Sequence, residues 1–358
     1  MVPSSHVADA VAARLDAFIA RIRENSAEYG PDGALFLDAA ADTLRGGKRL
    51  RARFCHAGWL AGGGAELGTD ALWDLSAALE VFQSAALVHD DLIDNSDTRR
   101  GRPAAHRALE SLHHVAGWHG DAESFGRSAS VLLGDLLVAW SDDLLEEALA
   151  DHPHASTTRA EYARMRRDVT VGQMLDITEE SAWSIAPAHT LLERALRVAA
   201  LKSARYSVEQ PLVLGASLAG ADAVAVAALR SFGHPIGMAF QLRDDVLGVF
   251  GDPEVTGKPA GDDLREGKRT ALIAIARERL SDRDRTALDA GVGDPALSPA
   301  DVAGLQRLVR DTGALERVEE MIDDYTAQAE RALTEARLAD TAVTALRTLA
   351  EAAVARRA

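Results

Sequence analysis

The chain has 358 residues, 47% hydrophobic and 26% charged, a composition typical of a soluble globular protein. Its formal net charge of -16 argues against a general surface for nucleic acid or for an anionic membrane. The single cysteine, Cys55, excludes an intrachain disulfide and fits a reducing cytoplasm.

The N-terminal segment has the pattern of an amphipathic helix and lacks the basic and apolar regions of a signal peptide. Its apolar residues recur at intervals of three and four: Val7, Val11, Leu15, Phe18, Ile19 and Ile22. Nowhere does the sequence approach the ~18 uninterrupted apolar residues of a membrane span. We therefore expect a cytoplasmic protein without stable membrane insertion.

The same periodicity predicts helices along most of the chain. They cover residues 33–45, 49–61, 71–94, 127–150, 159–181, 188–203, 223–250, 268–280, 299–312 and 313–337, with a last helix to about 356. Loops are expected at 61–68, 113–126 and 251–263. Alternating β-branched segments are missing, so no sheet is expected. The fold class predicted is all-α, with the whole chain, 1–358, as a single domain.

Two of these helices, 71–94 and 223–250, are apolar around much of their circumference. Such helices lie inside a bundle rather than on its surface. We therefore expect them at the centre of the fold.

The first chemically suggestive stretch is "LRGGKRLRARF", residues 44–54, in which five basic residues surround a Gly-Gly pair. A Gly-Gly turn lets backbone N–H groups and basic side chains meet one anion. The spacing of a Walker loop is absent. On its own the stretch also fits a solvated basic patch.

Three carboxylates, Asp90, Asp91 and Asp94, close the apolar helix at 71–94. On a helix Asp90 and Asp94 lie about 40° apart and Asp91 about 100° from Asp90, so all three can face one cavity. Asp244 and Asp245 begin the same pattern in the helix at 223–250, where the fifth position is Gly248.

Carboxylates at the C-terminal end of a helix oppose its macrodipole, and like charges raise one another's pKa unless a cation intervenes. Two such clusters therefore predict a shared counter-ion. Carboxylates without His or Cys partners suit Mg²⁺ or Mn²⁺, and Mg²⁺ usually completes its shell with substrate phosphates. The simplest hypothesis is a diphosphate bridged by magnesium between two acidic helix faces. Further cations accompany the motifs: Arg99, Arg100, Lys202, Lys258 and Lys268.

Taken together, the motifs resemble the trans-prenyl diphosphate synthases of the polyprenyl synthetase family, and geranylgeranyl diphosphate synthases in particular. The matching stretches are "GGKRLR" (46–51), "DDLID" (90–94), "RRG" (99–101), "GQMLD" (172–176), "KSARYS" (202–207), "FQLRDDVLG" (240–248) and "GKPAGDDLREGKRT" (257–270). Seven motifs in the expected order, over residues about 40–280, make the resemblance specific. It implies a helical bundle of the isoprenoid synthase type with a central cavity, and a homodimer.

The resemblance also implies roles for individual residues. Magnesium, as three ions, would be bound by Asp90, Asp91, Asp94, Asp244 and Asp245, with Asp263 in direct contact or acting through water. Isopentenyl diphosphate would be held by Lys48, Arg51, Gln83 and Arg100. The allylic diphosphate would be held by Arg99, Lys202, Lys258 and Lys268, and Ser203 and Gln241 would stabilise the developing carbocation.

Two departures from the family pattern stand out. Gly248 replaces the final aspartate of the second motif, which weakens ligation by three carboxylates but leaves Asp244 in place. Ser203 stands where many members have threonine, which keeps the hydroxyl.

The implied reaction is the head-to-tail condensation of isopentenyl diphosphate with dimethylallyl, geranyl or farnesyl diphosphate. Phe82, Ala85 and Ala86 precede the first motif on its helix, where the growing hydrocarbon would run. Ala85 and Ala86 leave that turn open, and Phe82 lies two turns back, about 12 Å along the axis. The side chain of Phe82 could floor the pocket or point into the core. The sequence favours geranylgeranyl diphosphate and leaves farnesyl or longer products open.

Two other functions compete with this one. A terpene cyclase also pairs an aspartate-rich motif with magnesium, but it has no use for a second diphosphate site. A non-catalytic partner subunit of a heteromeric synthase should have lost catalytic aspartates or lysines, whereas here only Gly248 departs.

Overall fold

The computed structural model describes residues 4–99, 101–252 and 261–354. The first half contains α1 (Ser4–Glu24), η1 (Ala27–Tyr29), α2 (Gly30–Thr43), α3 (Leu50–Ala61), α4 (Asp70–Ile93), α5 (Ala105–Ala116), α6 (Ala122–Leu149) and α7 (Ala155–Ala182). The second half contains η2 (Ala188–Thr190), α8 (Leu191–Val198), η3 (Ala199–Glu209), α9 (Gln210–Leu218), α10 (Ala223–Phe250), α12 (Asp262–Glu266), α13 (Ala271–Arg279), α14 (Asp282–Gly291), α15 (Pro299–Asp311), α16 (Ala314–Glu335) and α17 (Asp340–Val354).

The all-α prediction is confirmed, with corrections to single elements. The described residues include one ladder, the two-residue strands β1 (Thr98–Arg99) and β2 (Arg102–Pro103), where no sheet was expected. The loop expected at 113–126 is wrong at both ends, because α5 runs to Ala116 and α6 begins at Ala122. Helices α5, α9, α12 and α14 were not expected. Helix α5 buries two histidines beside Leu109, α9 is apolar on every side, and α14 buries a single residue, Leu288.

Helix α4 lies in the core, as expected. Thr69 caps its first turn by accepting a hydrogen bond from the Leu72 N–H group at 3.3 Å. Below the cap, Leu72, Leu75 and Leu79 are completely buried. Helix α6 packs along α4, and the Ser141 hydroxyl of α6 donates to the Ala78 carbonyl at 3.0 Å. Burial on several sides explains why α4 is apolar around its circumference.

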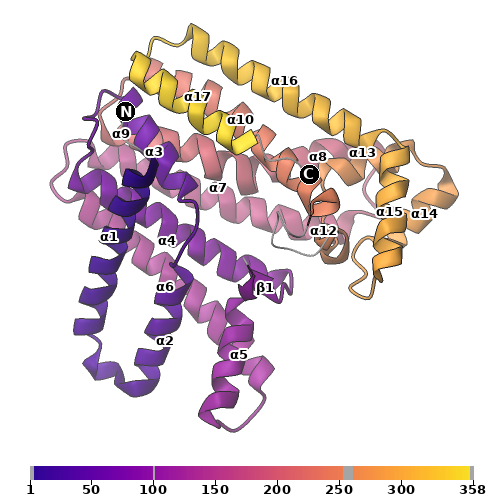
Figure 1. The fold of residues 1–358 in the computed structure, drawn as a ribbon, viewed down its shortest axis with the longest axis horizontal. Helices are drawn as coiled ribbons and strands as arrows, with labels where there is room; N and C mark the ends of the chain where they lie inside the picture. Colours follow the sequence, from indigo (N-terminus) through magenta and orange to yellow (C-terminus); the bar gives the residue numbers. More distant parts are fainter. Residues whose placement is uncertain (1–3, 100, 253–260, 355–358) are drawn as a thin grey trace.

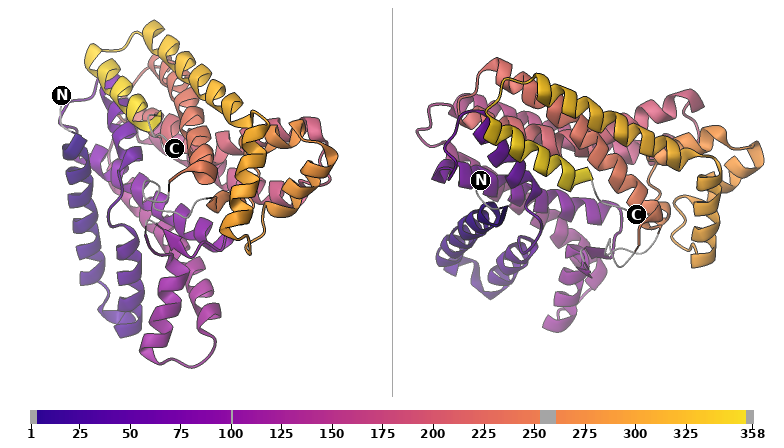
Figure 2. Two further views of the ribbon diagram at one scale, coloured as in Figure 1. Left: turned by 45° about the vertical axis from the view of Figure 1, so that its right-hand side comes forward. Right: turned by 45° about the horizontal axis from the view of Figure 1, so that its top comes forward.

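Helix α10 joins two parts of the core. Its buried residues contribute to one apolar cluster with α13–α16 and to another with α3, α9 and α17. Helices α16 and α17 lie over it along the upper edge of the molecule in Figure 1. At the opposite edge the pair α1–α2 and the pair α5–α6 project from the body (Figure 2).

The segment from α8 to α9 is one continuous helical path of 28 residues, Leu191–Leu218, whose centre, η3, is π-helical. The expected helix at 188–203 ends too early, because the wider π-turns interrupt the 3.6-residue period on which the prediction depended. The motif that contains Lys202 and Ser203 lies in η3. Short π-helical stretches inside α-helices are frequent at functional sites.

Among the described residues, α4 and α10 are long and apolar enough to cross a membrane by length and composition alone. In the 18-residue apolar stretch of each helix, 72% of the residues of α4 and 44% of those of α10 are buried inside the protein. Core helices of soluble proteins pass the same test, so this is weak support for a membrane span.

Candidate active site

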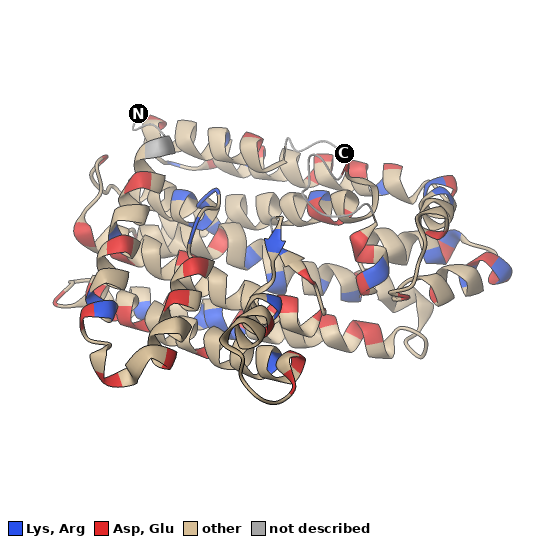
Figure 3. Ribbon diagram, turned by 60° about the horizontal axis from the view of Figure 1, so that its bottom comes forward, with Lys and Arg blue, Asp and Glu red and all other residues tan. Residues whose placement is uncertain are grey.

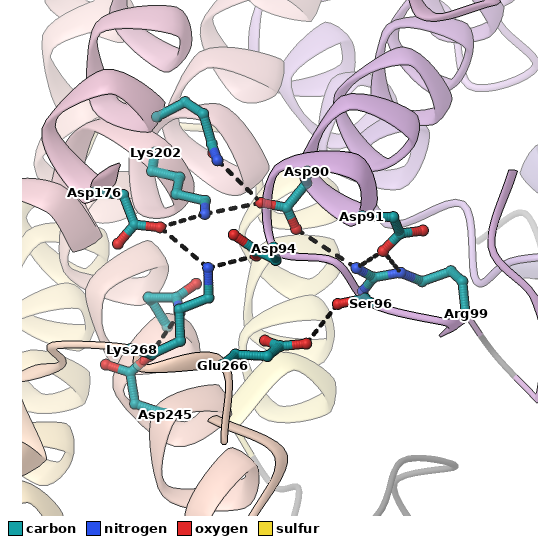
Figure 4. Close-up of polar contacts among 12 residues, drawn as sticks. Asp90, Asp91, Asp94, Ser96, Arg99, Asp176, Lys202, Asp245, Glu266 and Lys268 are labelled. Atoms are coloured by element: carbon teal, nitrogen blue, oxygen red, sulfur yellow. Dashed lines mark hydrogen bonds and ion pairs between the residues drawn. The ribbon is translucent and has the colours of Figure 1, made fainter. Parts of the chain in front are cut away.

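The first acidic cluster lies at the C-terminal end of α4 and is paired with arginine. The Arg99 Nε atom donates to Asp91 Oδ1 at 2.8 Å, and a second guanidinium nitrogen reaches the same oxygen. Arg99 Nη2 is also 3.5 Å from Asp90 Oδ2. Arg99 belongs to β1, so the short hairpin turns the chain back over the end of α4. Arg99 therefore contacts both Asp90 and Asp91 (Figure 4).

Two lysines and one further carboxylate complete this cluster. Lys202 Nζ of η3 lies 2.9 Å from Asp90 Oδ1 and 2.6 Å from Asp176 Oδ2. Lys268 Nζ contacts Asp94 and lies 3.4 Å from the same Asp176 oxygen. Asp176 of α7 thus holds both ammonium groups, as Figure 4 shows. The result is an alternating arrangement of positive and negative charge between α4, α7 and η3.

The electrostatic balance differs between neighbouring carboxyl groups. Burial acts to raise the pKa of Asp90, but Lys202, Lys268 and Arg99 outweigh burial and lower it. Burial and the charge of Asp90 raise the pKa of Asp94 to about 6. Burial lowers the pKa of Lys202, but Asp90 and Asp176 outweigh that effect and raise it, which keeps the ammonium group charged.

The second acidic cluster lies on α10. Asp244 is exposed, whereas Asp245 is 6% exposed and accepts a hydrogen bond from Gln241 Nε2 at 2.7 Å. Burial raises the pKa of Asp245 to about 7, with Asp244 and Asp176 adding to the rise and Lys202 opposing it. The charges of Asp176 on α7 and Lys202 on η3 therefore act on Asp245 of α10.

The carboxylate oxygens of the two acidic clusters are ligands that suit a divalent cation such as Mg²⁺. No three His, Cys, Asp or Glu side chains in the described part of the chain converge closely enough to form a metal site by themselves. Magnesium does not need three protein ligands at one point, since it usually binds one or two carboxylates and completes its shell with water and phosphate. The raised pKa values of Asp94 and Asp245 mark carboxylates that a nearby divalent cation would stabilise in their charged form.

The basic stretch at residues 44–54 forms a turn and the start of α3. Gly46 and Gly47 have φ angles of +74° and +88°, and residues with a side chain rarely adopt such positive angles. Arg49 follows with φ +50° and lies 3.7 Å from Glu80 Oε2, and the other Glu80 oxygen accepts from the Ala52 N–H group at 3.1 Å. Buried Glu80 therefore fixes this turn, and Lys48 stays exposed.

Tyr206 connects two residues predicted to bind isopentenyl diphosphate. Its hydroxyl donates to Gln83 Oε1 at 2.8 Å, and the Arg51 guanidinium lies over its ring at 4.1 Å from the centroid. Arg51 Nη2 also donates to the Ser207 hydroxyl at 2.7 Å. The buried Nε atom of Arg51 has no hydrogen-bond partner among the described residues.

The residues before the first motif lie on two faces of α4. Phe82, Ala86 and Asp90 are four residues apart and share one face. Phe82 is buried and packs edge-on against the rings of Tyr162 and Tyr206. Ala86 is partly exposed, whereas Ala85 is 1% exposed and belongs to the core. Of the two alanines, Ala86 is the one on the stripe with Asp90.

Two predicted residues, Arg100 and Lys258, lie outside the described residues. Ser203 is partly exposed on η3, close in sequence to Lys202. Sequence reasoning missed three participants: Asp176, Tyr206, and Gln173, whose Nε2 atom donates to Asp90 Oδ1 at 3.2 Å. All three stand within stretches already matched to the family, "GQMLD" and "KSARYS". Membership of those motifs was the signal that could have identified them.

Comparison with known proteins agrees with this geometry. A family model described as Polyprenyl synthetase matches residues 34–309. A geranylgeranyl pyrophosphate synthase of Corynebacterium glutamicum, crystallised with isoprenyl diphosphate and magnesium, is 40% identical, with a TM-score of 0.93 over all of both chains. A geranylgeranyl diphosphate synthase of Mycobacterium tuberculosis is 33% identical over 81% of this chain and 75% of its own length. A geranylfarnesyl diphosphate synthase of Aeropyrum pernix is 30% identical over 79% of this chain and 82% of its own.

Proposed function

The chain belongs to the polyprenyl synthetase family and is a prenyl-transferring enzyme, and on this premise we propose that it makes geranylgeranyl diphosphate. The reaction condenses isopentenyl diphosphate head-to-tail with allylic diphosphates, with trans geometry at each new double bond. One observation carries the proposal. Lys202 contacts Asp90, Lys268 contacts Asp94, and Asp176 contacts both lysines.

The allylic diphosphate binds between α4 and α10 in this proposal. Lys202, Lys268 and Arg99 supply its positive contacts, and each now contacts an aspartate of the first cluster. Asp90, Asp94 and Asp244 would hold magnesium, which supplies neutralisation of the charge that grows on the departing diphosphate. The carboxylates would thereby release the lysines to the phosphate oxygens.

The second substrate binds at the turn before α3. Lys48, Arg51 and Gln83 hold isopentenyl diphosphate, and the contacts of Tyr206 with Arg51 and Gln83 fix the relative positions of these two groups. Matched binding of both substrates places the double bond of one beside the reacting carbon of the other.

The chemistry then needs no protein nucleophile. The allylic C–O bond breaks, and its electron pair leaves with diphosphate. The double bond of isopentenyl diphosphate attacks the resulting allylic cation, which forms the new C–C bond. A proton is lost from the adjacent carbon to the released diphosphate, and this loss regenerates a double bond. The Ser203 hydroxyl and the Gln241 amide stabilise the cation through their dipoles, and the apolar core of α4 keeps water away.

Product length follows from the face that carries Phe82, Ala86 and Asp90. Ala86 leaves room for the growing chain, and Phe82, packed against two tyrosines, ends that room. The two-turn distance of about 12 Å suits a hydrocarbon longer than farnesyl. The relatives described as geranylgeranyl synthases support this length, and the geranylfarnesyl relative shows that longer products occur in similar proteins.

We also propose that the enzyme is a cytoplasmic homodimer. Four exposed apolar residues support the dimer: Val131 and Leu132 of α6, and Val171 and Met174 of α7. Both helices meet the end of α4 at this level, because His89 contacts the Val131 carbonyl and Gln173 contacts Asp90. We call these four residues the α6–α7 apolar face. Burial of such a face against a second copy removes apolar surface from water.

The experiment that tests the proposed function is an incubation of the purified chain with labelled isopentenyl diphosphate and each allylic primer. The reaction is run with magnesium, with manganese and with a chelator, and the dephosphorylated products are separated by chromatography. We expect a metal-dependent C20 alcohol. A hydrocarbon formed from geranylgeranyl diphosphate alone would indicate a cyclase, and no product from the purified chain would indicate a non-catalytic subunit.

A further inference from the structure

Arg49 lies in the basic stretch before α3, but its side chain points back into the turn. Only 10% of that side chain is exposed, and its Nη2 atom donates to the Leu44 carbonyl, five residues earlier, at 2.6 Å. Lys48, the preceding residue, is exposed. The Arg49 guanidinium therefore closes the Gly-Gly turn on itself.

The backbone at Arg49 has an unusual conformation. Its φ and ψ angles are +50° and +45°, in the left-handed region that residues with a side chain rarely adopt. Arg49 is also the N-cap residue of α3, and its own side chain makes no capping hydrogen bond. Such a conformation persists only where the surrounding structure holds it. The turn therefore depends on contacts from outside α3.

Glu80 of α4 supplies those contacts. Its side chain is 7% exposed, and its Oε2 atom lies 3.7 Å from Arg49 Nη1. The other oxygen, Oε1, accepts from the Ala52 N–H group at 3.1 Å. Ala52 is the third residue of α3, and the N–H groups of a first turn need acceptors outside their own helix. Glu80 thus caps α3 from a different helix and faces the charge of Arg49.

Helix α4 also holds the other end of the turn. The Ser84 hydroxyl, one helical turn after Glu80, donates to the carbonyl of Thr43, the last residue of α2, at 3.2 Å. Residues 44–49 therefore connect two points that are both fixed on α4. Gln83, which the resemblance assigns to isopentenyl diphosphate, lies beside Ser84 in the same turn of α4.

We propose that Glu80 and Arg49 are positioning residues for isopentenyl diphosphate. They hold the Gly-Gly turn against α4, so that Lys48 and Arg51 keep a fixed place relative to Gln83. Neither member of the pair contacts the substrate itself. This inference rests on the proposed function, since it assigns the second substrate to this turn. Without the charge of Glu80, the Arg49 guanidinium is buried beside no counter-charge, which favours its release to water and opening of the turn.

Glu80→Gln tests this role by steady-state kinetics of the full chain. The variant keeps an oxygen that can accept from the Ala52 N–H group and removes the charge that faces Arg49. We expect kcat/KM for isopentenyl diphosphate to fall about 10- to 100-fold, the effect of misplacing a substrate-binding group by about 1 Å. At saturating isopentenyl diphosphate, the KM for the allylic substrate should stay within about twofold, because Lys202 and Lys268 lie outside this turn.

Glu179→Gln is the matched control. Glu179 of α7 is likewise a buried glutamate, 4% exposed, and it lies 2.8 Å from the Arg194 guanidinium. The variant makes the same change of charge and also removes a buried ion pair, so it should lower the melting temperature. Its kcat/KM for isopentenyl diphosphate should remain within about twofold of wild type. A general loss of stability is thereby separated from a loss of position.

A double-mutant cycle tests whether the two residues act together. Arg49→Gln should reproduce the effect of Glu80→Gln, and the double variant should lose no more than the weaker of the two single variants, because the pair acts as one unit. Arg49→Lys keeps the charge beside Glu80 and should recover part of the activity. If Glu80→Gln fails to fold by circular dichroism, Ser84→Ala decides the matter: it should lower kcat/KM for isopentenyl diphosphate about three- to tenfold.

The inference is wrong if folded Glu80→Gln keeps wild-type kcat/KM for isopentenyl diphosphate, if both substrates lose equally, or if the effects of the two single variants simply add. A wild type that does not condense isopentenyl diphosphate would contradict the proposed function, and the inference falls with it. If wild type condenses it while Glu80→Gln behaves like Glu179→Gln, only the inference fails.

Discussion

At the scale of single residues, Tyr206 contacts both the residues proposed to bind isopentenyl diphosphate and the residue proposed to limit product length. Its ring packs on Phe82 and under Arg51, and its hydroxyl donates to Gln83. Burial raises the pKa of the Tyr206 hydroxyl, so that group remains a donor at all ordinary pH values. With its carbonyl oxygen bound to Tyr206, the Gln83 amide would keep its NH₂ group for the proposed isopentenyl diphosphate.

Tyr206→Phe removes this hydrogen bond and keeps the ring. We expect the KM for isopentenyl diphosphate to rise about three- to tenfold, the usual effect of one lost hydrogen bond, because the Gln83 amide is free to rotate. The KM for the allylic substrate should change little. Steady-state kinetics with each substrate varied in turn makes the comparison, and an equal rise in both constants would count against this role.

Ala86→Phe places a ring between Phe82 and Asp90 on the face proposed for the hydrocarbon. We expect the main product to shorten from C20 to C15 or C10, measured by chromatography of the dephosphorylated products. Ala85→Phe is the matched control, because Ala85 is buried in the core and its enlargement should lower the melting temperature by overpacking. An unchanged product distribution in a folded Ala86→Phe enzyme would refute the proposed floor.

At this scale the sequence could predict which charged residues gather at the site, but it could not predict which residue each of them contacts. The spacing of Asp90, Asp91 and Asp94 predicted a shared face, yet Asp91 turns to Arg99. That contact depends on the β1–β2 hairpin, which brings residue 99 back over α4. Two-residue strands carry no periodic signal, so the sequence held no means of placing the guanidinium.

At the scale of elements, Asp289 ties the end of α7 to α13 and α14. It accepts hydrogen bonds from Trp183 Nε1 at 2.9 Å and from Arg277 Nε at 2.8 Å, and Arg277 Nη2 reaches its other oxygen at 2.9 Å. Burial acts to raise the pKa of Asp289, but the bonds from Arg277 and Trp183 outweigh it and lower the pKa below its ordinary value of 3.8.

Asp289→Asn should lower the free energy of unfolding at neutral pH by about 1–3 kcal/mol, because charge-assisted hydrogen bonds are lost. A depressed pKa in the folded state means that this stability is complete above the ordinary aspartate pKa and is lost as pH falls below it. The difference between wild type and variant in urea unfolding should therefore shrink in acid. Asp282→Asn, fully exposed on α14, serves as control and should match wild type throughout. A difference that grows in acid would contradict the assignment.

Element prediction succeeded for long helices with many buried apolar residues and failed for several short helices. Helices α4 and α10 were predicted nearly to their ends, because their apolar residues are continuous. Helix α5 was missed, because two of its three buried residues are His106 and His113. Helix α14 buries only Leu288. For such helices, tertiary packing decides the structure and the pattern of apolar residues does not.

At the scale of the whole molecule, a net charge of -16 surrounds a site proposed for two anionic substrates. Acidic and basic residues are interspersed over the helices in Figure 3. Positive charge must therefore be concentrated locally. Lys202, Lys268 and Arg99 achieve this by partial burial beside carboxylates, which keeps them charged and in fixed positions.

The proposed homodimer depends on the α6–α7 apolar face. Leu132→Glu with Met174→Glu places two charges on residues that are each 62% exposed, and we expect a shift from dimer to monomer in analytical ultracentrifugation. Burial of unpaired charge in an interface explains the loss. Val224→Glu, on an exposed residue at the start of α10, should stay dimeric. A monomeric wild type, or a dimer that survives both charges, would refute the interface.

The central claim is that acidic groups of α4 and α10 bind magnesium together with a diphosphate. A crystal structure with magnesium and an uncleavable allylic diphosphate analogue tests it most directly. We predict metal density contacting Asp90, Asp94 and Asp244, with the Lys202 and Lys268 ammonium groups moved onto phosphate oxygens. Diphosphate bound elsewhere, or no metal between the two helices while both lysines keep their aspartate contacts, would contradict the account.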